Sequence, residues 1–180
     1  MATLPREVID AYTERLNALS DASRRVVAAQ LAQIEYEGIA DLREKVTAIL
    51  EPVCAASSDA AAAYAAEFYD EVREAQAGAA LGAEAVSAHS AEATAAAVRA
   101  MVQAVVDGKP WEHFARQVED RADYEVKRSA GECVKANAAR DPLRPKWARV
   151  PSGTETCDFC LMLASRGFAY SSERSASEKA

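Results

Sequence analysis

The sequence predicts a mainly α-helical protein, in which an elongated helical bundle or coiled hairpin is followed by a small α+β cysteine-knuckle region. Apolar residues recur at three- and four-residue spacing over most of the chain, as they do on the buried face of a helix. Half of the 180 residues are hydrophobic and many of these are alanine, which favours closely packed helices. From residue 111 onward charged and aromatic side chains become more frequent, which indicates a second region.

We divide the chain into three parts on these grounds. Residues 1–110 form an Ala-rich acidic helical region, residues 111–170 a helix followed by a C-x-x-C segment, and residues 171–180 a polar tail. The sequence Asp107-Gly108-Lys109-Pro110 separates the first two parts, because glycine and proline together end a helix.

Local signals divide the first part into helices. A first helix is expected to begin at Pro5 and to end at the SDAS sequence of residues 20–23, where Ser20 is a candidate cap. A second helix is expected over residues 22–50, interrupted at Gly38 and ended by Pro52.

Two more helices are expected before residue 110, and one after it. Ser57 and Ser58 are candidate caps of a third helix, and a fourth is expected over residues 83–106. A further helix is predicted over residues 111–139 and is ended by the sequence of residues 141–145. Its inward face follows a four-residue step: Phe114, Val118, Ala122, Val126, Ala130 and Val134.

Charge is distributed unevenly. Residues 1–110 carry 9 Lys and Arg against 17 Asp and Glu, a net −8, whereas residues 121–150 carry 8 against 4, a net +4. The acidic part should repel nucleic acid, and the basic stretch is the candidate contact with DNA or with an acidic partner. A solvated basic helix face remains the favoured interpretation of that stretch. The candidate contact residues are Arg121, Lys127, Arg128, Arg144 and Lys146.

Targeting signals are not evident in the sequence. It holds no run of about 18 apolar residues, so no membrane-spanning helix is expected. The first ten residues lack the basic and apolar regions of a signal peptide. We therefore expect a cytoplasm, or a particle assembled in one, as the compartment.

Cys157 and Cys160 have the spacing at which two thiolates can face one metal ion. Zinc takes four such ligands, and this pair supplies two. The other cysteines, Cys54 and Cys133, show no matching pair. A dithiol oxidoreductase would use the same spacing, but the strand and helix that usually flank it are not predicted here. Two unligated thiols in a turn are the third interpretation.

Catalytic constellations are not apparent either. His89 lies in an Ala- and Ser-rich segment and His113 lies close to Trp111. Neither is accompanied by a serine and an acidic residue in a pattern typical of a catalytic triad. We interpret both as surface or packing residues, and the sequence favours a protein without enzymatic activity.

A long series of specific positions surrounds the cysteine pair: 121–123, Gly131, 137–138, Asp141, 147–151, Gly153, Thr156, Cys157, Phe159, Cys160, 163–167 and Tyr170. In these positions the chain resembles the C-terminal part of minor head proteins from phages and prophages of actinobacteria, which belong with the MuF-like head morphogenesis group. The resemblance covers about residues 115–170. In that family a His-x-x-Cys-x-Cys-like cluster follows downstream, and this chain ends at Ala180 before any such cluster.

This resemblance implies a low-copy minor capsid protein that enters the head with the portal and assists head assembly or DNA passage. The implied partners are portal, capsid or scaffold proteins, and the implied location is the virion, with the host cytoplasm during assembly. It implies zinc only in a longer form, so either the chain is truncated and Cys157 and Cys160 form an incomplete site, or the metal is absent. A homo-oligomer formed through the helices also fits. The alternatives are a dithiol oxidoreductase or capsid maturation protease, and a helical protein-interaction module.

Overall fold

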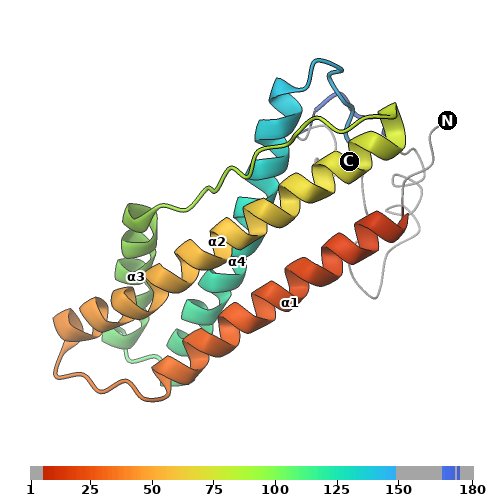
Figure 1. Ribbon diagram of the computed structural model, residues 1–180. Coiled ribbons are helices and arrows are strands. Elements are labelled where there is room, and N and C mark those ends of the chain that lie inside the picture. Colours follow the sequence, from red (N-terminus) through yellow and green to blue (C-terminus); the bar gives the residue numbers. More distant parts are fainter. Residues whose placement is uncertain (1–5, 149–167, 173, 175–180) are drawn as a thin grey trace.

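The computed structural model describes residues 6–148, 168–172 and 174. Within this part the chain forms four helices: α1 (Arg6–Leu31), α2 (Ile39–Ala77), α3 (Ala91–Val106) and α4 (Trp111–Arg140) (Figure 1). The prediction of a mainly helical protein is confirmed. The predicted α+β region falls largely outside the described residues, which contribute only an isolated antiparallel bridge between Trp147 and Tyr170.

Helices α2 and α4 form the centre of the bundle, and α1 and α3 each pack against both of them. α1 runs along most of the central pair, whereas the shorter α3 covers one end of it (Figure 1). The core therefore has two parts that differ in composition.

The first part of the core lies at the end where four helices meet. Branched and aromatic side chains fill it, because four helix surfaces leave space that only large residues occupy. Its buried members come from all four helices: Val27, Leu31, Leu42, Val46, Leu50, Cys54, Val98, Val102, Phe114, Val118 and Ala122.

The second part of the core lies where α3 is absent. Here α2 presents alanines at 61, 62, 65 and 66 to Val126, Ala130 and Cys133 of α4, and α1 adds partly buried side chains such as Leu16. Small side chains permit close helix packing but bury little apolar area, so this part gains less hydrophobic stabilisation than the first.

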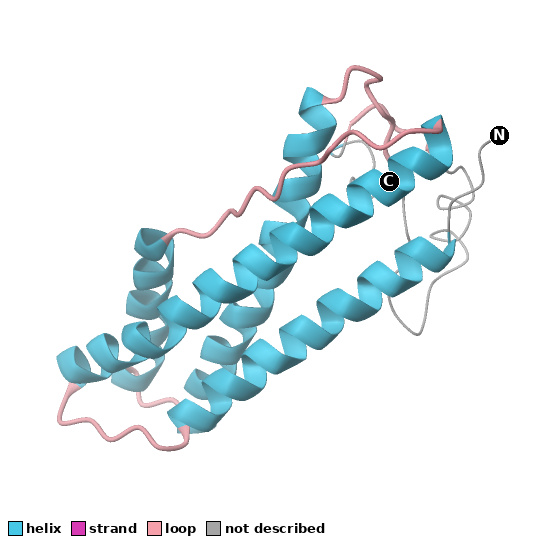
Figure 2. Cartoon of the chain, in the orientation of Figure 1, coloured by secondary structure: helices cyan, strands magenta, loops and turns pink. Residues whose placement is uncertain are grey.

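An extended segment covers this Ala-rich part in place of a helix. Residues 79–90, here called the strap, run back along α2 and α4 from the end of α2 to the start of α3 (Figure 2). The prediction of a helix from residue 83 is therefore wrong for its first part, and α3 begins at Ala91 with Ser90 as its cap. The predicted stop is confirmed, since α3 ends at Val106 and Gly108 has a φ of 71°.

The predicted break at residues 20–23 is wrong, because α1 continues through it to Leu31. Ser20 and Ser23 are buried and their hydroxyls are satisfied without ending the helix. Ser23 donates to the carbonyl of Leu19 at 2.9 Å, and Ser20 donates to Asp123 of α4. A serine inside a helix is tolerated when its hydroxyl finds such partners.

The predicted helix end at Pro52 and the caps at Ser57 and Ser58 are also wrong, because all three residues lie inside α2. Pro52 cannot donate to the carbonyl of Ala48, but both residues lie on the exposed face, where water can reach that carbonyl. The single helix predicted over residues 22–50 is wrong, because its first part belongs to α1, which ends at Leu31, and its second part to α2; Gly38 is the residue before α2.

The predicted inward face of the last helix is confirmed. α4 covers Trp111–Arg140, and the four-residue row from Phe114 to Ala130 is buried, with Val134 half-buried. Asp141 caps the helix where its end was expected. Figure 2 shows the chain leaving α4 as a loop at this end.

Phe114→Ala tests how far the bundle depends on its four-helix end. Phe114 is fully buried and its ring lies 5.1 Å from that of Trp111, so truncation leaves a large cavity. We expect a loss of about 3–5 kcal/mol in the free energy of unfolding, measured by urea titration with circular dichroism. Val106→Ala is the control, since Val106 is 54% exposed and its change should stay within about 0.5 kcal/mol.

Candidate functional site

The predicted metal ligands Cys157 and Cys160 lie outside the described residues. Within the described part, no group of three or more His, Cys, Asp or Glu side chains is placed to hold a metal ion. Cys54 and Cys133 are buried, unpaired thiols. Burial raises the pKa of the Cys54 thiol to about 12, so this thiol is protonated and unreactive at neutral pH.

The five predicted basic contact residues fall into two groups. Arg121 and Arg128 both bond to Glu125, whose side chain is fully buried, and their own side chains are 18% and 26% exposed. Lys127 is 62% exposed and pairs with Asp123 at 2.8 Å. Arg144 and Lys146 are exposed in the loop after α4. The structure therefore separates two arginines in a buried ion-pair cluster from three exposed basic residues, Lys127 on α4 and Arg144 and Lys146 after it.

The two histidines also differ in environment. His89 is 15% exposed, and its Nε2 lies 3.2 Å from a carboxylate oxygen of Glu51 on α2. His113 is exposed on the first turn of α4. His89 thus joins the end of the strap to α2.

A row of polar side chains on α4 lies beside the apolar row and was missed by sequence reasoning. Its members follow a four-residue step and are all buried. We call these five residues the polar row: Glu125, Ser129, Cys133, Asn137 and Asp141. The regular step was visible in the sequence, but nothing there indicated which segment would face it.

The strap is the segment that faces the polar row. Asn137 accepts a hydrogen bond from the N–H of Glu84 and donates to its carbonyl, both at 2.9 Å. Ser129 accepts from the N–H of Ala88 at 3.1 Å and donates to the carbonyl of Ser58 on α2 at 2.9 Å. These side chains supply the partners that a neighbouring strand would supply in a sheet.

Further side chains fasten the first half of the strap. Asp70 of α2 accepts from three successive backbone N–H groups, those of residues 81, 82 and 83, at 2.8–3.1 Å. Arg140 donates to the carbonyl of Gly82 at 2.7 Å. Arg73 donates to the carbonyls of Ala79 and Ala80 at 2.5 and 3.2 Å.

Asp141 connects the strap to the end of the bundle. Its carboxylate accepts from Arg73 at 2.7 Å and from the hydroxyl of Tyr69 at 3.0 Å, and its side chain is fully buried. The hydrogen bond from Arg73 lowers the pKa of Asp141; burial opposes this, and the bonds from the Leu143 N–H and Tyr69 lower it further. The carboxylate is therefore held in its charged form.

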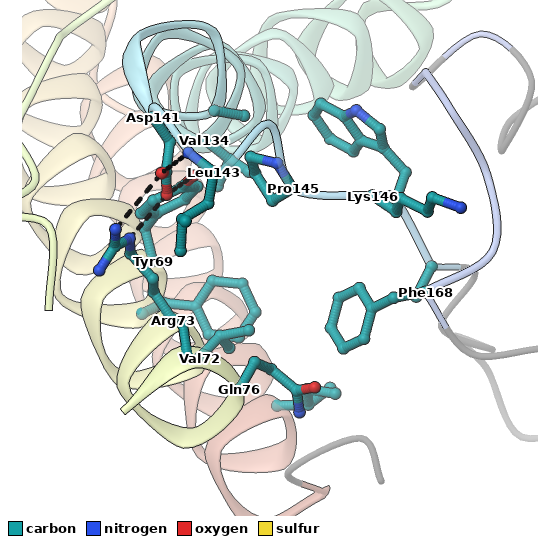
Figure 3. Close-up of a pocket in the computed structure, with 16 residues that line it drawn as sticks. Tyr69, Val72, Arg73, Gln76, Val134, Asp141, Leu143, Pro145, Lys146 and Phe168 are labelled. Carbon is teal, nitrogen blue, oxygen red and sulfur yellow. Dashed lines mark hydrogen bonds and ion pairs between the residues drawn. The ribbon is translucent and has the colours of Figure 1, made fainter. Parts of the chain in front are cut away.

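Beside Asp141 lies a recess of about 390 Å³, which we call the end recess (Figure 3). Apolar side chains dominate the described lining, and the Arg73 and Asp141 groups in it are bonded to one another. Its chemistry is therefore that of apolar contact. The lining residues are Ile9, Phe68, Tyr69, Val72, Arg73, Gln76, Ala77, Val134, Ala138, Asp141, Leu143, Pro145, Lys146, Trp147, Ala148 and Phe168.

Asp141→Asn tests the role of this carboxylate in stability. Because the folded-state pKa of Asp141 is lowered, its contribution is present above the unfolded pKa of about 3.9 and is lost as pH falls through the folded value. We expect the variant to have a lower urea midpoint than the parent at pH 7, with the difference closing below about pH 4. A pH-independent difference would contradict this role.

Comparison with known protein families identifies one that matches this chain. The VG15 protein family matches residues 3–180, which is nearly the whole chain. Neither the curated proteins nor the solved structures gave a match. Within the described residues no helix combines the length and apolarity needed to cross a bilayer. The chain belongs to the VG15 protein family, a family of phage genes, and is therefore a phage protein.

Proposed function

We propose that this protein is a structural and assembly component of the phage head, present in low copy and associated with the portal. Membership of a phage family over residues 3–180 carries the proposal. The resemblance of residues 115–170 to minor head proteins narrows it to the head. Portal, capsid or scaffold proteins are then the partners, and the capsid interior or portal region is the location in the virion.

The charge of the bundle supports docking on protein. The acidic charge lies mainly on α2, which carries eight Asp and Glu against three Lys and Arg, and whose exposed face includes Asp59, Glu71 and Glu74. Such a face repels DNA and suits a basic surface on a partner. This acidic face is the one we assign to the portal or capsid.

We assign contact with DNA or with an acidic partner to the exposed basic residues. Arg144 and Lys146 are exposed beside the end recess, and Lys127 is 62% exposed on α4. Arg121 and Arg128 are less suited to this contact, because both neutralise the buried Glu125.

The composition of phage particles tests the proposal. We expect mass spectrometry of purified heads to detect this protein in far fewer copies than the major capsid protein. An amber mutation in its gene should yield heads that are missing or defective, and expression of the protein in the host should restore them. Complete, infectious particles made without the protein would refute the proposal.

The cysteine pair is proposed as one half of a zinc site. Two thiolates fill only half of a tetrahedral shell, so the 180-residue chain should lose zinc to a mild chelator. Zinc content is measured by mass spectrometry of the metal, with Cys54→Ser as the control for a buried thiol. Stoichiometric zinc that resists the chelator and is lost in Cys157→Ser would show that ligands within this chain complete the site.

A further inference from the structure

The strap differs from the helices in how it is held. None of its twelve residues is buried, and residues 84–87 at its centre are exposed. The groups that hold it are buried: Ser129, Cys133 and Asn137 are fully covered. Ala83 packs against the Ala-rich part of the core but is itself only half-buried. The strap therefore contributes little apolar burial of its own.

The bonds to the strap engage its main chain. The N–H groups of residues 81–84 and 88 donate to side chains of α2 and α4, and carbonyls of residues 79, 80, 82, 84 and 88 accept from them. Water can replace such bonds, so each makes a small net contribution to stability. Releasing the strap also returns backbone entropy to a segment of twelve residues.

The caps of the adjoining helices use only Gly78, just before the strap, and Ser90, its last residue, so they can persist when the residues between them leave α2 and α4. Gly78, with a φ of 80°, caps α2 by donating its N–H to the carbonyl of Glu74. Ser90 caps α3 by accepting from the N–H of Ala93 at 3.2 Å. α3 is fixed to the bundle separately, through the fully buried Val98 and Val102.

We propose that the strap detaches from α2 and α4 as a unit while the four helices stay packed. Detachment uncovers Ser129, Cys133 and Asn137 of the polar row and leaves the four-helix end of the core intact. It is a local opening with a lower free energy than global unfolding. The strap is thus a releasable cover over the seam between α2 and α4, and the seam becomes accessible only in the open form.

The two buried thiols report this opening. Cys133 lies beneath the strap, with its Sγ 3.4 Å from the carbonyl of Glu84, whereas Cys54 lies in the four-helix part of the core. In full-length protein carrying Cys157→Ser and Cys160→Ser, we expect a thiol reagent to label Cys133 at least tenfold faster than Cys54. Hydrogen exchange should show the amides of residues 81–84 and 88 exchanging together, ahead of those in α2 and α4.

Asn137→Ala should accelerate labelling of Cys133 by roughly tenfold to a hundredfold, because it removes both bonds to Glu84, and it should leave labelling of Cys54 unchanged. Arg140→Ala is a milder second variant if Asn137→Ala does not fold, since it removes a bond at the rim. Val86→Ala is the matched control, because this exposed strap side chain makes no bond to the polar row. Equal labelling of Cys54 and Cys133, or labelling of Cys133 that neither Asn137→Ala nor Arg140→Ala alters, would overturn the proposal.

Discussion

The position of the strap on the bundle depends on one constraint, which is that its extended backbone needs hydrogen-bond partners that neither a helix nor a sheet provides. Polar groups of a chain laid against helices lose contact with water and must be satisfied by side chains. The polar row and Asp70 supply these partners, and Asn137 satisfies both main-chain groups of Glu84. The strap in turn carries the chain back along the bundle, so that α3 reaches the four-helix end.

The polar row also places a charged side chain, that of Glu125, inside the protein. Glu125 is fully buried between Arg121 and Arg128, and Arg128 also donates to the carbonyl of Ala88 in the strap. A buried ion pair often contributes little net stability, because desolvation offsets the attraction, but the loss of one partner is costly. Glu125 therefore holds two arginines in position, and Arg128 in turn holds the strap at Ala88.

The sequence predicted correctly the features that follow from periodicity and turn chemistry. It predicted helix ends wrongly where tertiary packing outweighed a local signal. The inward row from Phe114 to Ala130 and the helix stop at Asp107 were predicted, since both follow from spacing and turn chemistry. Ser20, Pro52 and Ser57 were interpreted as helix ends, but each is tolerated inside a helix: Ser20 donates to Asp123 of α4, Ser57 donates to the carbonyl of Cys54, and Pro52 is exposed. The basic stretch was recognised by composition, whereas the pairing of Arg121 and Arg128 with Glu125 required the three-dimensional contacts.

The segment that resembles minor head proteins leaves the bundle at Asp141, where α4 ends. This carboxylate holds Arg73, which fastens the start of the strap, and it accepts from the N–H of Leu143, which sets the path of the chain leaving α4. That path leads to Trp147, which pairs with Tyr170 through two backbone hydrogen bonds of 2.8 and 3.0 Å and lines the end recess. The buried carboxylate of Asp141 thus links the start of the strap to the loop that follows α4. The end recess is therefore lined in part by Arg73 and Asp141, the two residues that hold the start of the strap.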